Sequence, residues 1–133
     1  IMRELLDKLI FLESKLSKEK GYFNLFALFL REEAEDRWDI VVSASWLESN
    51  NKKSFDYLAK ELKTNLTNQE LLLISRIVVM DEGNPGLEAI NRAFHVEHGL
   101  ADVRDSNFFG LQIKHAYIIT STRKVSEKIT QSA

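Results

Sequence analysis

The side chains best suited to holding a metal ion lie between His95 and Asp102. His95 and His98 are three positions apart, so both imidazoles can project from one face of a helix. Imidazole nitrogens and the Asp102 carboxylate are ligands that zinc and other divalent ions accept. The alternative is an ordinary helix C-terminus, where a positively charged histidine interacts favourably with the helix dipole. We favour this alternative and predict no metal or other cofactor.

A sharp turn at Asp81–Gly86 is a candidate site for a small ligand. Asn84 can cap a helix, and Pro85 suits the first helical position. A helix N-terminus that follows a strand often binds anions, so Asn84 and Gly86 are candidate ligand-binding residues. The turn lacks the glycine spacing of a dinucleotide loop, and the acidic residues that open it would repel phosphate. A plain turn is therefore the favoured interpretation.

Asp39, Gln112 and Lys114 lie on the more polar sides of two predicted strands. If these strands are neighbours, a carboxylate, an amide and an amine converge. The arrangement resembles the pattern of restriction-endonuclease-like nucleases, in which acidic groups hold a divalent metal and a lysine helps to activate water. The resemblance implies a metal-dependent nuclease, or an inactive relic of one, that uses these three residues. The alternative, which we favour, is a solvated sheet face with ordinary charges.

The composition excludes several kinds of chemistry. The chain has no cysteine, so disulfides and thiolate zinc sites are impossible, and it has no Gly-x-Ser-x-Gly nucleophile elbow. Its formal net charge of −2 predicts no broad basic face, so nucleic acid is not expected as a primary ligand. No apolar run is long enough to cross a membrane and no signal peptide is visible, which predicts a cytoplasmic protein. No catalytic residue stands out, so an enzyme is the less favoured interpretation.

The elements that position these residues are organised around an apolar hairpin. The first strand, 22–30, is apolar on both faces, which is typical of a strand covered on both sides. A charged segment, 31–37, forms the exposed turn. The second strand, 38–46, alternates between apolar and polar residues and pairs antiparallel with the first. A helix or a partner subunit must cover the second apolar face of the first strand.

The rest of the chain predicts one α+β domain over residues 1–122 and a polar tail at 123–133. The further elements are a helix over 2–20, an amphipathic helix containing 55–66, a short helix from 67, a strand at 77–80, a helix over 87–94, an edge strand at 101–104 and a last strand at 108–121. Thr67 and Glu70 form a capping box, and Gly110 marks a bulge. The main order is α-β-β-α-α-β-α-β. It predicts a mixed sheet of about four or five strands with helices mainly on one face.

The chain also has more large aromatic residues than a small core obviously needs. Tryptophan and tyrosine are enriched where protein partners dock. Core filling is the favoured interpretation for most of these aromatic residues, but we expect at least one cluster at an interface. The candidate interface residues are Phe23, Phe29, Trp38, Trp46, Phe108 and Phe109.

The hairpin sequence, over 25–32 and 36–47, resembles a small bacterial family described as the antitoxin components of toxin–antitoxin pairs. The resemblance implies a cytoplasmic protein that binds a toxin, and it transfers no active-site residues. Our leading hypothesis is a non-enzymatic protein–protein interaction module with a protein partner. We also expect self-association through the sheet or the first helix. The alternatives are the metal-dependent nuclease and a small-ligand-binding domain.

Overall fold

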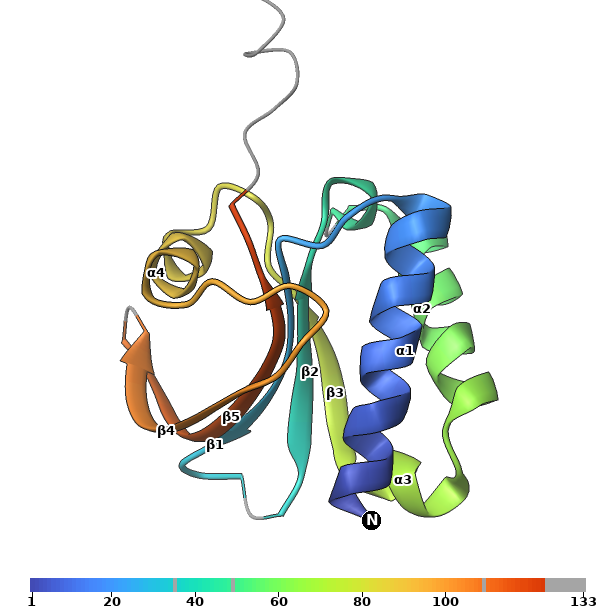
Figure 1. The fold of residues 1–133 in the computed structure, drawn as a ribbon, viewed down its shortest axis with the longest axis horizontal. Coiled ribbons are helices and arrows are strands. Elements are labelled where there is room, and N and C mark those ends of the chain that lie inside the picture. Colours follow the sequence, from blue (N-terminus) through green and yellow to red (C-terminus); the bar gives the residue numbers. More distant parts are fainter. Residues whose placement is uncertain (35, 49, 109, 124–133) are drawn as a thin grey trace, which may run out of the picture.

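In the described residues, five strands form one mixed sheet with the order β3-β2-β1-β5-β4 (Figure 1). The computed structural model describes residues 1–34, 36–48, 50–108 and 110–123. Strands β2 and β3 are parallel, and the other neighbouring pairs are antiparallel. The strands are β1 (Leu25–Arg31), β2 (Trp38–Ser43), β3 (Ile74–Val79), β4 (Ala101–Phe108) and β5 (Leu111–Ser121). The predicted α+β fold with a mixed sheet is confirmed.

The helices lie on both faces of the sheet, but mainly on one. Helices α1 (Met2–Lys20), α2 (Lys52–Asn65) and α3 (Asn68–Leu72) are on one side, as predicted. Helix α4 (Pro85–Ala93) lies on the opposite side, inside the curl of β4 and β5 (Figure 1). None of the helices in the described ranges combines the length and apolarity needed to span a membrane.

Several predicted strand boundaries were wrong, and two of the differences change how the chain turns. Strand β2 ends at Ser43 and a short 3₁₀ helix, η1 (Ser45–Leu47), follows it. The indole N–H of Trp46 donates to the carbonyl of Gly21 at 3.0 Å, which fastens this turn to the end of α1. The predicted edge strand, 101–104, extends to Phe108 as β4, and the predicted last strand, 108–121, begins only at Leu111 as β5, so the two strands form a hairpin. Gly110 has φ 87° and lies in its turn rather than at a bulge, in a conformation that glycine adopts without strain.

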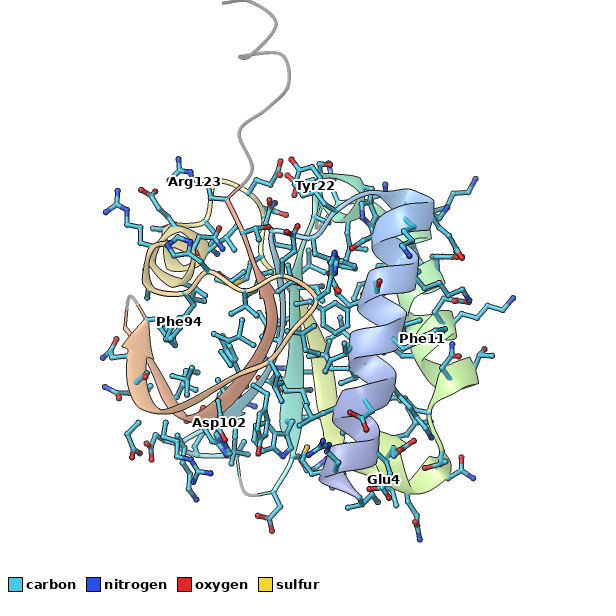
Figure 2. The ribbon with its side chains drawn as sticks, in the orientation of Figure 1. Glu4, Phe11, Tyr22, Phe94, Asp102 and Arg123 are labelled. Carbon is cyan, nitrogen blue, oxygen red and sulfur yellow. The ribbon has the colours of Figure 1, made fainter. Side chains whose placement is uncertain are left out.

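The two faces of β1 bury separate apolar cores. On the first face, Phe26 and Leu28 pack against the leucine stripe of α1. On the second face, Phe29 belongs to a core with residues of α4 and β4. Figure 2 shows Phe94 between α4 and the curled hairpin, where its ring meets that of Phe108 at 5.8 Å. The chain itself therefore covers the second apolar face for which a helix or a partner subunit was expected.

The predicted capping box at the start of α3 is present. The Thr67 hydroxyl accepts from Glu70 N at 3.1 Å, and Glu70 Oε1 accepts from Thr67 N at 2.8 Å. Lys8 Nζ lies 2.8 Å from the same Oε1. Burial acts to raise the pKa of Glu70, but the hydrogen bonds from Lys8 and Thr67 outweigh it and the pKa is lowered. The buried carboxylate thus joins α3 to α1.

Glu48→Gln is expected to stabilise the protein at neutral pH. Burial, followed by the nearby Asp81 and Glu82, raises the pKa of Glu48 above 4.5, and its buried Oε2 has no hydrogen-bond partner in the described residues. A carboxyl whose pKa is raised by folding contributes full stability below its unfolded pKa and loses it as the pH rises through the folded pKa. We expect a gain on the order of 1 kcal/mol at neutral pH. Thermal melts across the acidic and neutral range check this prediction. An equal gain below pH 4.5 would contradict it.

Candidate functional site

Strand β3 is an open edge of the sheet. It pairs with β2, and no other described strand lies along its opposite side. Met80 N donates to Val42 O at 2.8 Å, so strand alternation directs the N–H and C=O groups of Ile77 and Val79 away from β2. An unpaired row of backbone donors and acceptors is a template for another strand. At the start of this edge, Arg37 Nη2 donates to Ile74 O at 2.7 Å.

An apolar groove of about 500 Å³ adjoins β3 on the face that carries α2 and α3. It forms because α2 buries only part of its apolar stripe, with Leu58 and Leu62 in the core, while α3 is short. Lys63 lines the groove from α2. The other main lining residues are Leu62, Leu66, Leu71, Ile74 and Ile77. The groove offers apolar contact to any segment that lies along β3.

A charged recess of about 190 Å³ adjoins β3 on the opposite face. Asp39 is 3% exposed and accepts a hydrogen bond from Arg31 Nε at 2.7 Å. The hydrogen bond to Asp39, and then the one to Glu33, raises the pKa of Arg31. Arg76 Nε lies 3.3 Å from the same carboxylate oxygen of Asp39. The second oxygen, Oδ1, is buried and has no hydrogen-bond donor in the described residues.

The recess brings together two residues that the sequence assigned to different candidate sites. Asp39 and Asn84 both line it. Asn84 Oδ1 accepts from Gly86 N at 2.7 Å, so it acts as the predicted N-cap of α4. Arg31 and Arg76 were not predicted as residues of a site. The signal in the sequence that could have identified them is a charged residue within or beside an apolar strand.

The predicted nuclease residues do not converge. Strand β1 lies between β2, which carries Asp39, and β5, which carries Gln112 and Lys114. Ile113 packs in the same core as Val41, on the Asp39 side of the sheet, so alternation directs Gln112 and Lys114 to the other side. Asp39 is instead engaged by two arginines. The proposed convergence of the three residues is therefore wrong.

The predicted histidine site is also dispersed. His98 Nδ1 lies 2.6 Å from Glu13 Oε1, whereas Asp102 Oδ1 lies 2.7 Å from Nε2 of a different histidine, His115. His95 is exposed. Across the residues that the structure describes, no three histidine, aspartate or glutamate side chains are grouped to hold a metal ion.

A buried polar network around Glu13 was missed. Glu13 is fully buried and accepts hydrogen bonds from Ser17 Oγ at 3.1 Å and from Thr120 Oγ1 at 2.8 Å. With His98, these contacts join α1, β5 and the segment after α4. The signal in the sequence was a glutamate four positions after Leu9, on the apolar stripe of the first helix.

Most of the aromatic residues predicted for an interface lie in the interior. Phe23, Phe29, Trp38 and Phe108 are between 1% and 7% exposed. Trp46 is half-buried, and Phe109 lies outside the described residues. The interior positions correct the prediction for the first four residues, because their contacts within the chain already occupy them.

No family model, curated protein or solved structure matches this chain. Function is therefore inferred from the edge of β3 and from the groove and recess beside it.

Proposed function

We propose that this protein is a non-enzymatic interaction module that binds an extended segment of another protein along β3. The observation that carries the proposal is the unpaired edge of β3 with an apolar groove beside it. In this mode of recognition, backbone hydrogen bonds provide affinity and pockets for alternate side chains provide specificity. A toxin in the cytoplasm is one partner of this kind, as the resemblance to antitoxin components implies.

The other edge of the sheet is less suited to this role. Strand β4 carries the exposed charges of Asp102, Arg104 and Asp105. Asp105 has φ 48°, and it has no pairing partner in the β4–β5 ladder, although the register is the same on both sides of it. Charged residues and local irregularity are common devices that prevent an edge strand from pairing with another chain.

A different protein is a better occupant of β3 than a second copy of this chain. Pairing of two β3 strands would bring two copies of Arg76 into one short ladder, and like charges on adjacent strands are destabilising. An open edge also allows self-association, in which β3 of one copy pairs with β3 of a second copy. Light scattering on the purified chain distinguishes the two arrangements, since strand addition by a different partner predicts a monomer.

Val79→Pro is expected to weaken segment binding strongly while leaving the fold intact. The N–H of Val79 points away from β2, so proline removes a donor at the open edge and keeps the β2–β3 ladder. Peptides selected from a displayed library of random segments would be titrated against both forms by calorimetry. We expect at least about a tenfold loss of affinity, which corresponds to about 1.4 kcal/mol.

Val79→Ala is the matched control, because it trims the same side chain and retains the N–H. Its affinity for the selected peptides should stay close to that of the unmodified chain. The proposal fails if the library yields no binder, or if the proline and alanine variants bind equally well.

A further inference from the structure

We infer that the partner segment presents a carboxylate to Arg76 on the recess side of β3 and apolar side chains on the groove side. This inference deepens the proposed function and rests on it. It names the partner chemistry: an extended, acidic segment with apolar residues at alternate positions.

Of the two arginines that line the recess, Arg76 is the one with donors to spare. Its side chain is 56% exposed, and its Nε lies 3.3 Å from Asp39 Oδ2. It forms no hydrogen bond within the described part of the chain. Arg31, in contrast, is 20% exposed and donates to both Asp39 and Glu33 at 2.7 Å. A guanidinium with free donors at the surface is suited to bidentate binding of a carboxylate.

The charges around the edge also favour an acidic partner. The residues that line the groove and the recess include three basic side chains, Lys63, Arg31 and Arg76, and one acidic side chain, Asp39. This local excess of positive charge contrasts with the net charge of −2 for the whole chain. Complementary charge speeds association and disfavours partners of the wrong sign.

Strand alternation assigns the two kinds of side chain to the two faces. Arg76 lies on the recess side, together with Asp39, whereas the next residue, Ile77, lines the groove. On an added strand, a residue opposite Arg76 would therefore lie on the recess side, and its neighbours would face the groove. The expected pattern is a carboxylate between apolar residues.

The test exchanges the charge on both sides of the contact. A selected peptide with glutamate at the position opposite Arg76 would be compared with its Glu→Lys version. Both would be titrated against the unmodified chain, Arg76→Gln and Arg76→Glu. We expect Arg76→Gln to lower the affinity for the acidic peptide about fivefold. Arg76→Glu should lower it about tenfold or more, which corresponds to about 1.4 kcal/mol. The lysine peptide should prefer Arg76→Glu over the unmodified chain.

Arg104→Glu is the matched control, because it makes the same change of charge at an exposed position on the opposite edge strand. It should alter the affinity less than about twofold. If Arg76→Glu does not fold because its new carboxylate lies beside the buried Asp39, the comparison of Arg76→Gln with the unmodified chain is the test. Equal binding of the acidic peptide to all Arg76 variants overturns the acidic specificity. The proposed function survives that result if Val79→Pro still weakens binding at least about tenfold, and it fails separately if Val79→Pro has no effect.

Discussion

Phe26→Ala is expected to lower the free energy of unfolding by about 3–5 kcal/mol. Phe26 is fully buried on β1, the central strand of the sheet, and its ring meets that of Phe23 edge-to-face at 5.0 Å. Truncation leaves a cavity between β1 and α1 that the close-packed core cannot fill completely, and it also removes the aromatic contact. Guanidinium denaturation of the two proteins, followed by circular dichroism, measures the difference.

Phe11→Ala is the matched control for this measurement. Phe11 is on α1 but is 69% exposed, so the same chemical change opens no cavity there. Its effect on unfolding should stay within about 0.5 kcal/mol. Similar losses for the two variants would contradict the assignment of Phe26 to the core.

Glu13→Ala is expected to lower the free energy of unfolding by about 2–3 kcal/mol. The buried carboxylate accepts hydrogen bonds from Ser17 and Thr120 and lies 2.6 Å from Nδ1 of His98. Its removal deprives these donors of their acceptor in the interior, and His98, at 44% exposed, can recover part of the loss from water. Denaturant unfolding measures the total effect.

Hydrogen exchange locates the effect of Glu13→Ala. The amides around His98 should lose protection more than those of β2, because Glu13 fastens the segment after α4 to α1. Glu19→Ala on the same helix is the control, since Glu19 is exposed and its removal should change little. Uniform loss of protection, or none, would argue against this fastening role.

The helices were largely predictable because their signals are local. The leucine stripe of α1 runs to Leu16 and Gly21 caps the end of the helix, and the capping box of α3 joins Thr67 to Glu70. Both features connect residues within one or two helical turns, so neighbouring positions in the sequence carry the information.

The strand boundaries were less predictable because alternation reports burial rather than pairing. The alternating pattern of β2 continues to Trp46, but pairing ends at Ser43. A contact with Gly21, distant in the sequence, turns the chain there. In the same way, the apolar run around Gly110 did not show that two strands meet at that glycine.

The amino-acid sequence alone was sufficient for the fold class, the helix caps and the apolar hairpin, because short-range periodicity and capping chemistry specify them. The tertiary structure decided which polar residues meet. Asp39 lies near Asn84 and away from Lys114 because β1 separates β2 from β5. It also decided that α4 and β4 cover the second face of β1, while the edge of β3 stays open. Strand order and curvature arise from burial between distant segments, and no local pattern contains them.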